Sequence, residues 1–388
     1  MKILIVNAFY YPNMIGGTEQ SIKLLSEGLV KRGHEVFILT GDSSKISEEK
    51  GVKITRLGFQ SENESKLKKI NRKIIQFNGY IISDIINKVL DSIKPDVVHT
   101  NNLFNLSTII WKCAKKRNIK VTHTIRDYWG LCLKSTLLDS KGEICVKSKG
   151  LCKIHKHNYK LSTKYVDIVT SPSKFTLDMY KDNYMFEKSE KKVIPNAIDF
   201  DIDKREKLLR NRLDNNSNII TFLFIGSLDT HKGIKFLIES FKDTKLDNIR
   251  LSICGDGPLK KYVEENIKID NRINYLGKVL NADKEKVLIS SDVMVVPSIW
   301  YEPFGRVVIE GYKYGMPVIA SQIGGISELL EENISLGVKP NCNEELTNAM
   351  KLLSNKEMVK KYISTNHEII SKYDIEKQID MFEEIYSL

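Results

Sequence analysis

The chain has 388 residues, 41% hydrophobic and 28% charged, with a formal net charge of +11, and this balance excludes a disordered, collagen-like or disulfide-scaffold protein. At roughly 100–200 residues per domain, the length predicts two domains. No apolar run approaches the ~18–20 residues of a membrane-spanning helix, and the run after Met1 turns polar at Asn7, too early for a signal peptide. We therefore expect a cytoplasmic protein with reduced cysteines.

The first half of the sequence predicts an open α/β sheet. An apolar strand at residues 2–8 leads through a turn-rich stretch to a helix at 19–32, which ends at Gly33 before a second apolar strand at 36–40. Continuous apolar strands around a helix indicate a βαβ unit in a parallel sheet. Three further buried strands are predicted, at residues 96–99, 121–124 and 167–170.

The second half repeats this plan after a short strand that ends at 194–197 and a polar, Asn-rich segment at 199–218. Strands are predicted at 219–226, 250–254, 292–296 and 317–320, alternating with helices at 232–241 and 305–314. A last amphipathic helix is predicted at 375–386. Since ligands of open α/β sheets bind beyond the carboxyl ends of the strands, we expect two facing domains that share a cleft.

The positive charge is concentrated in the first half. Residues 1–200 carry 34 basic and 20 acidic side chains, whereas residues 201–388 carry 26 and 29. The first half therefore favours an anionic partner, although a lysine-rich composition alone explains the excess equally well. Because aromatic residues are not interleaved with the basic runs, we do not expect a nucleic-acid partner.

The most informative stretch is residues 297–310, in which Glu-Pro-Phe-Gly links a buried strand to a helix. The free N–H groups of residues 304–307 would form an anion site at the start of that helix. Glu302 and Glu310 lie on either side of this helix start, and carboxylates accept hydrogen bonds from sugar hydroxyls strongly. The alternative is a capped helix with two surface glutamates.

Weaker signals lie at other loops. Lys232 precedes a predicted helix and can reach a phosphate as a point charge. Gly16 and Gly17 allow the backbone to approach a ligand closely. The Gly255-Asp256-Gly257-Pro258 segment is an incomplete dinucleotide fingerprint, so we expect no nicotinamide cofactor.

Taken in order, these residues resemble the retaining glycosyltransferases of family 4, and the resemblance covers nearly the whole chain. Its most specific mark is the pair Glu302 and Glu310, separated by seven residues. The other matching residues are Gly16-Gly17 with Glu19, Gly33-His34-Glu35-Val36, Pro95-Asp96-Val97-Val98-His99, Asp127-Tyr128-Trp129, Pro195-Asn196, Lys232-Gly233, Gly255-Asp256-Gly257-Pro258, and Gly315-Met316-Pro317-Val318-Ile319-Ala320 with Gly324-Gly325 and Glu328.

The resemblance implies a GT-B fold, in which two Rossmann-like parallel-sheet domains face each other across a cleft. The acceptor-side domain would be residues 1–198, and the donor-binding domain residues 199–370. The C-terminal helix, residues 371–388, would return to the first domain.

The resemblance also implies a role for each matching residue. Glu302 would bind hydroxyls of the donor sugar and Glu310 those of the ribose, while Gly16 and Gly17 would approach the donor from the first domain. The diphosphate would be held by Lys232 and by the backbone N–H groups of Phe304, Gly305, Arg306 and Val307. No metal would be required, and transfer from a nucleotide sugar to a glycan or lipid-linked acceptor would build a cell-surface polysaccharide or glycolipid.

Two departures from the family pattern leave alternatives open. Ser227, in the donor-binding loop, replaces a usual arginine, and Arg126 replaces a usual histidine. An always-charged Arg126 cannot act as a base, and it would instead bind an anionic group or pair with Asp127. A catalytically silent nucleotide-sugar-binding subunit and a nucleotide-sugar epimerase therefore remain alternative functions.

Histidines and cysteines supply further candidates. His99 and His123 follow strand ends and would either face the cleft or be structural. Cys132, Cys145, Cys152 and His155 have the residue types of a structural zinc site, with free thiols or a redox pair as the alternatives.

The segment from Lys66 to Ile75 is basic and partly amphipathic. It would place the protein on the inner face of the plasma membrane near a lipid-linked acceptor, or it is simply a solvated helix.

Overall fold

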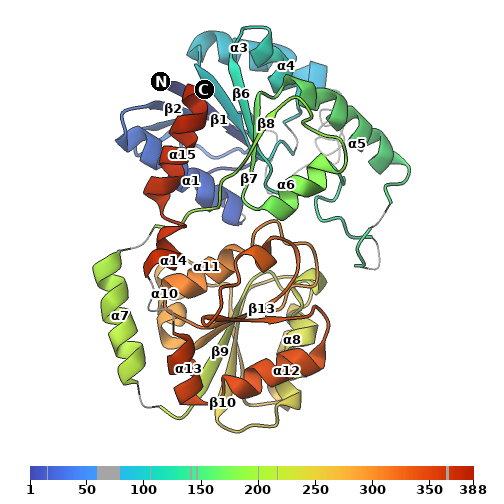
Figure 1. The fold of residues 1–388 in the computed structure, drawn as a ribbon. Helices are drawn as coiled ribbons and strands as arrows, with labels where there is room; N and C mark the ends of the chain where they lie inside the picture. Colours follow the sequence, from blue (N-terminus) through green and yellow to red (C-terminus); the bar gives the residue numbers. More distant parts are fainter. Residues whose placement is uncertain are drawn as a thin grey trace. The chain divides into compact units, whose positions relative to one another are not determined.

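The computed structural model describes residues 1–14, 16–58, 79–104, 106–139, 142–145, 147–199, 201–215, 217–363 and 367–388. The basic segment from Lys66 to Ile75 therefore lies outside the described residues. The chain forms two compact units (Figure 1). The first comprises Met1–Leu137, Cys145–Asp199 and Tyr373–Leu388, and the second comprises Leu138–Ile144 and Phe200–Lys372.

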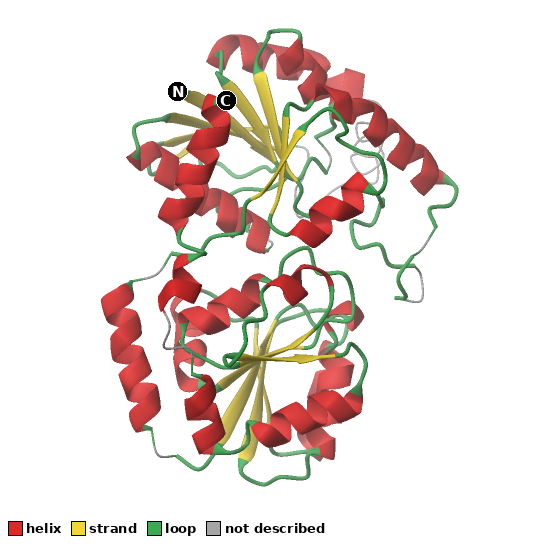
Figure 2. Ribbon diagram, viewed as in Figure 1, coloured by secondary structure: helices red, strands yellow, loops and turns green. Residues whose placement is uncertain are grey.

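The first unit is built on an eight-stranded sheet with the order β3-β4-β2-β1-β5-β6-β7-β8. All neighbours are parallel except β3 and β4. The strands are β1 (Lys2–Asn7), β2 (Glu35–Thr40), β3 (Glu48–Glu49), β4 (Val52–Arg56), β5 (Val97–Thr100), β6 (Lys120–Thr124), β7 (Ile168–Ser171) and β8 (Glu190–Val193). Their continuous apolar sequences are explained by burial on both faces, since helices lie on either side of the strands (Figure 2).

The helices of the first unit include the last helix of the chain. They are α1 (Gly17–Lys31), η1 (Gly79–Ile82), α3 (Ser83–Ile93), α4 (Ile109–Lys115), α5 (Leu151–Ser162), η2 (Thr163–Tyr165), α6 (Lys174–Lys181) and α15 (Ile375–Ser387). Helix α15 packs beside α1 (Figure 1). Gly28 of α1 makes this packing possible, because a Cβ atom there would overlap the side chain of Ile379.

A buried hydrogen-bond network joins α15 to the sheet. The Nδ1 of His99 lies 2.6 Å from the hydroxyl of Tyr386, and its Nε2 lies 2.7 Å from the hydroxyl of Thr124. Lys120 Nζ donates to the backbone carbonyl of Tyr386 at 2.9 Å. Burial, helped by the charge of Arg126, holds the pKa of His99 well below its usual value, so this imidazole is neutral.

The second unit is built on a six-stranded parallel sheet with the order β11-β10-β9-β12-β13-β14. The strands are β9 (Ile220–Ile225), β10 (Ile249–Cys254), β11 (Ile273–Gly277), β12 (Val293–Val296), β13 (Val318–Ser321) and β14 (Ser335–Val338). The helices are α7 (Ile202–Asp214), η3 (Thr230–Lys232), α8 (Ile234–Asp243), α9 (Lys260–Ile269), α10 (Asn281–Ser290), α11 (Arg306–Lys313), η4 (Gly324–Glu328), α12 (Asn343–Leu352), α13 (Lys356–Tyr362) and α14 (His367–Ser371). The α/β fold class predicted from the sequence is confirmed for both halves.

Helix α7 forms within the polar segment that follows the first unit. Asp201 caps it by accepting a hydrogen bond from the backbone N–H of Lys204 at 3.1 Å. Its buried face consists of Arg205, Leu209 and Arg212. Arg212 donates to backbone carbonyl groups of Leu288, Ser291 and Tyr314, so hydrogen bonds replace much of the usual apolar contact.

The network around His99 predicts the effect of one substitution. Tyr386→Phe removes the hydroxyl and leaves a buried imidazole nitrogen without its partner, so the free energy of unfolding should fall by about 1–3 kcal/mol. Urea denaturation followed by circular dichroism measures this loss. Tyr184→Phe is the control, because Tyr184 is 66% exposed. Equal midpoints for the two variants would show that the tether does not stabilise the fold.

Candidate active site

The loop between β12 and α11 ends in a turn that requires glycine. Gly305 has a φ of +97°, and a Cβ atom there would lie 2.7 Å from Cγ1 of Ile326. Gly305 is the N-cap of α11, and no side chain caps this helix start. The positive end of the helix dipole therefore has no side-chain cap, which is the arrangement that an anion-binding helix start requires.

Helical turn η4 holds this loop in place by backbone contact. The N–H of Gly325 donates to the carbonyl of Glu302 at 2.7 Å. A Cβ atom on Gly324 would lie 2.6 Å from that same carbonyl oxygen. The backbone at Glu302 is therefore fixed by two glycines that are distant in sequence.

Glu302 lies in a small polar cluster at the start of α8. Its carboxylate forms an ion pair with Lys232 and accepts a hydrogen bond from Ser298 Oγ at 3.3 Å. The Lys232 ammonium also lies 5.2 Å from the ring centroid of Trp300. The His231 ring packs against the same indole, with 5.1 Å between the two ring centroids. The lysine is thus held in position before any ligand arrives.

Glu310 forms a second cluster, one turn inside α11. It is 9% exposed, accepts a hydrogen bond from Lys284 Nζ at 2.7 Å, and lies 3.6 Å from Nε of Arg306. Burial lowers the pKa of Arg306, while the charge of Glu310 opposes that shift. Two cations therefore orient one carboxylate at this position.

The remaining donor-site candidates differ in exposure. Phe304 is buried, Val307 is half-buried, and Ser227 is exposed. Sequence reasoning missed Ser298, Trp300 and Lys284. Ser298 and Trp300 lie inside the stretch already singled out, but no pattern relates Lys284, 26 residues before Glu310, to that carboxylate.

In the first unit, polar side chains gather at the carboxyl ends of the strands. Asn7, at the end of β1, accepts a hydrogen bond from the N–H of Asn102 at 3.0 Å and donates to the carbonyl of Phe9. The N–H of Gly16 donates to Glu19 at 2.8 Å, so this carboxylate caps the start of α1. Gly16 is exposed, and Gly17 is half-buried.

Arg126 and Asp127 follow β6 at the same edge and bind different partners. Arg126, 9% exposed, donates to the side-chain oxygens of Asn101, at 2.9 Å, and of Asn196. Asp127 accepts hydrogen bonds from Asn102 Nδ2 at 2.8 Å and from the backbone N–H of Trp129 at 2.7 Å. Burial raises the pKa of Asp127 to about 6, in spite of the opposing hydrogen bond from Trp129.

The two candidate histidines are structural. His99 makes the buried contacts described above, and His123 lies between the hydroxyls of Thr100, at 2.9 Å, and Tyr159, at 3.1 Å. Burial lowers the pKa of His123 to about 3, which keeps it neutral. Of the two interpretations that the sequence allows, the structural one holds.

The expected zinc site is not assembled. In the described ranges, no three His, Cys, Asp or Glu side chains form a group that could hold a metal ion. His155 Nε2 hydrogen-bonds the backbone carbonyl of Trp129 at 2.7 Å, and Cys145 Sγ donates to the carbonyl of Lys147. Cys132 is buried and Cys152 half-buried, both as free thiols. The cysteines and the histidine are residue types that bind zinc, but the fold does not bring them together as a metal-binding group.

Comparison with known proteins identifies the family. The model of glycosyltransferase family 4 matches residues 15–202, and that of glycosyl transferases group 1 matches residues 205–369. A 42.6 kDa protein in the cps region of Klebsiella pneumoniae is 31% identical over 341 residues, which cover 85% of this chain and 87% of that protein. The chain belongs to glycosyltransferase family 4.

Other members of the glycosyltransferase group are more distant. The alpha-monoglucosyldiacylglycerol synthase of Streptococcus pneumoniae is 25% identical over 354 residues, covering 86% of this chain and 74% of that enzyme. Sucrose-phosphate synthase from Thermosynechococcus elongatus superposes with a TM-score of 0.78 at 19% identity, covering 100% and 98% of the two chains. Anabaena HepE, solved with UDP and glucose, superposes with a TM-score of 0.72 at 19% identity, covering 100% and 99%. These structures confirm the GT-B fold.

Among the helices that the structure describes in this glycosyltransferase, none is long and apolar enough to cross a membrane.

The raised pKa of Asp127 makes the stability of this glycosyltransferase depend on pH. Between the usual carboxyl pKa, near 4, and about 6, the native state keeps a proton that the unfolded state has released. The free energy of unfolding should therefore fall as the pH rises through this window and then cease to change on account of Asp127. The difference in unfolding free energy between the wild type and Asp127→Asn, measured by urea denaturation at several pH values, isolates this contribution.

An exposed carboxyl supplies the control for that measurement. Asp84→Asn, on the surface of α3, should leave the pH dependence unchanged. A wild-type minus Asp127→Asn difference that is flat from pH 4 to pH 6 would contradict the assignment.

Proposed function

We propose that this enzyme is a retaining glycosyltransferase that moves a sugar from a nucleotide-diphosphate sugar to a glycan or lipid-linked acceptor in the synthesis of a cell-surface polysaccharide or glycolipid. The observation that carries the proposal is the arrangement around the start of α11. An uncapped helix start lies between two oriented carboxylates, Glu302 and Glu310, with Lys232 paired to the first of them.

Each part of a nucleotide sugar has a matching group in this arrangement. The diphosphate is assigned to the N–H groups of Phe304, Gly305, Arg306 and Val307 together with Lys232. Glu310, oriented by Lys284, accepts hydrogen bonds from the ribose hydroxyls. Glu302 accepts hydrogen bonds from the hydroxyls of the donor sugar.

The same groups stabilise the transition state. As the bond between the anomeric carbon and the diphosphate oxygen breaks, negative charge grows on the leaving diphosphate. Helix N–H groups and an ammonium already in place stabilise that charge without reorganisation, which is usually the largest catalytic contribution. The acceptor hydroxyl attacks the same face of the sugar, its proton passes to a phosphate oxygen, and the anomeric configuration is retained. No step requires a metal ion.

The first unit is assigned to the acceptor. The excess of basic side chains lies in residues 1–200, where it favours a phosphate-bearing acceptor or a membrane surface. Arg126 contributes a fixed positive charge at the carboxyl edge of the sheet, whereas Gly16 and Gly17 of the same unit are assigned to the donor. Relatives in a cps region and in glucosyldiacylglycerol synthesis support a glycan or lipid-linked acceptor. Peripheral attachment to the inner face of the plasma membrane is a further part of the proposal and rests on the basic charge alone.

The donor is identified by ligand-dependent stabilisation. A thermal-shift screen with UDP-, GDP-, ADP- and dTDP-sugars should show one class that raises the melting temperature, because a ligand that binds only the native state stabilises it by mass action. Slow hydrolysis of that nucleotide sugar by the wild type would exclude a catalytically silent binding subunit.

The two carboxylates should differ in what they recognise. Glu310→Gln should weaken binding of both the nucleotide sugar and its free nucleoside diphosphate by about tenfold. Glu302→Gln should weaken only the nucleotide sugar, and Glu302→Ala should lower kcat about 10²–10³-fold. Calorimetry measures the affinities, and product formation measures the rate.

Glu265→Gln, on the exposed face of α9, is the matched control and should change neither affinity nor rate. If Glu302→Gln weakened the free diphosphate as much as the nucleotide sugar, its assignment to the sugar would be wrong. Full activity in Glu302→Ala would overturn the proposed mechanism.

A further inference from the structure

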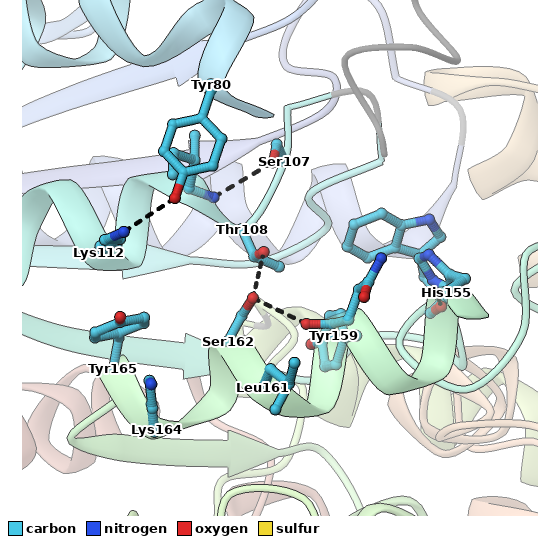
Figure 3. A pocket seen from close by; sticks show the side chains of 13 residues that line it. Tyr80, Ser107, Thr108, Lys112, His155, Tyr159, Leu161, Ser162, Lys164 and Tyr165 are labelled. Atoms are coloured by element: carbon cyan, nitrogen blue, oxygen red, sulfur yellow. Dashed lines mark hydrogen bonds between the residues drawn. The ribbon is translucent and has the colours of Figure 1, made fainter. Parts of the chain in front are cut away.

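The first unit contains a cavity that the proposed donor chemistry does not use. It has a volume of about 280 Å³ and lies between η1, the start of α4, and helices α5 and η2 (Figure 3). All of its lining residues belong to the first unit and are among those described. Its volume is close to the lower end of the range for small-molecule sites.

The cavity adjoins the polar edge of the sheet. Ser107 and Thr108 follow β5, and Trp129 follows β6, so the wall at this end comes from the same two loops that carry Asn102 and Asp127. The backbone N–H of Trp129 donates directly to the Asp127 carboxylate. A ligand in the cavity is therefore close to the edge assigned to the acceptor.

The cavity wall is positively charged. Lys112 and Lys164 line it, and no lining residue is an Asp or Glu. In the part of the chain that the structure describes, neither ammonium pairs with a carboxylate. On the same helix as Lys112, by contrast, Lys115 pairs with Asp167 at 2.8 Å. Unpaired lysines at a concave surface favour an anionic ligand.

Lys112 is held at the cavity by an aromatic partner. Its Nζ lies 3.0 Å from the hydroxyl of Tyr80, as Figure 3 shows, and this hydrogen bond raises the pKa of Lys112. Two of its three N–H donors remain for other acceptors. The Lys164 ammonium lies 5.2 Å from the ring centroid of Tyr165.

The remaining lining groups suit a sugar ring. Tyr80, Tyr165 and Trp129 supply aromatic surfaces, while Thr108 and Ser162 supply hydroxyls joined by a 3.0 Å hydrogen bond. Apolar walls with a few fixed polar groups are the usual composition of small-molecule sites. A bare inorganic anion would leave the aromatic walls unused, and a neutral sugar would leave the two lysines unused.

We propose that this cavity binds an anionic sugar unit, a sugar phosphate or a uronic acid, with Lys112 and Lys164 holding its negative charge. The statement that the bound sugar is part of the acceptor rests on the proposed function, whereas the binding of an anionic sugar to the cavity does not. The sugar phosphate has two sources, a soluble molecule or the headgroup of a lipid-linked sugar.

Calorimetric titration of the full chain without any donor tests the proposal. Glucose 6-phosphate or glucuronic acid should bind saturably, and at least tenfold more tightly than glucose or inorganic phosphate. Lys112→Met and Lys164→Met should each weaken that binding about tenfold. Lys116→Met, an exposed lysine on the turn that follows α4, is the matched control and should have no effect. None of the three lysines is buried, so the urea midpoints of the variants should match that of the wild type.

The two sources are separated by a flotation assay with phosphatidylcholine vesicles that carry glucosyl-phosphoundecaprenol. Vesicle binding that is lost in Lys112→Met, with weak binding of soluble glucose 6-phosphate, assigns the site to a lipid-linked sugar phosphate. Soluble binding alone assigns it to a free sugar phosphate or uronic acid.

The proposal is overturned if neither the anionic sugars nor these vesicles bind, if inorganic phosphate binds as tightly as glucose 6-phosphate, or if Lys116→Met has the same effect as Lys112→Met. Because the titration contains no nucleotide sugar, any of these outcomes would contradict only the proposal about the cavity. Failure of the donor site would appear instead in nucleotide-sugar binding and hydrolysis.

Discussion

The start of α11 is fixed by backbone packing, and the donor side of the proposed mechanism depends on it. Gly305 adopts a left-handed conformation, and Gly324 and Gly325 bring η4 against the backbone of Glu302. Because these contacts involve main-chain atoms, they set the direction of the helix N–H groups without using any side chain. The carboxylates and lysines around them pair with one another instead of capping the helix start.

A common principle relates the functional edges of the two units. In each, the strands are parallel and their interior is apolar, so polar side chains gather where the strands end. In the first unit these are amides that bind Arg126 and a carboxyl that binds the amide of Asn102, and in the second they are carboxylates paired with lysines. Amide and carboxyl groups can recognise hydroxyls, while paired charges at a helix start can recognise a diphosphate.

The fold was largely predictable because buried parallel strands leave continuous apolar runs. Helix α7 was not expected, because its buried face is made by Arg205 and Arg212, which hydropathy patterns place on a surface. Glu302, Glu310 and Lys232 could be singled out because they lie next to a recognisable strand-to-helix turn. Lys284 could not, because its contact with Glu310 depends on tertiary packing alone. The prediction of a zinc site failed for the opposite reason, because the cysteines and the histidine lie near one another in the sequence but do not form a metal-binding group in the described residues.

The ion pair between Lys232 and Glu302 gives the donor site its own internal counter-ion. A small anion that attracts the lysine leaves the half-buried carboxylate with the Ser298 hydroxyl but without its cation, and that loss opposes binding. In the proposed function, a nucleotide sugar supplies phosphate oxygens for the lysine and hydroxyls for the carboxylate at once, so neither group is left unpaired. The pair would then favour binding of the intact donor over binding of the free phosphate that is abundant in any cell.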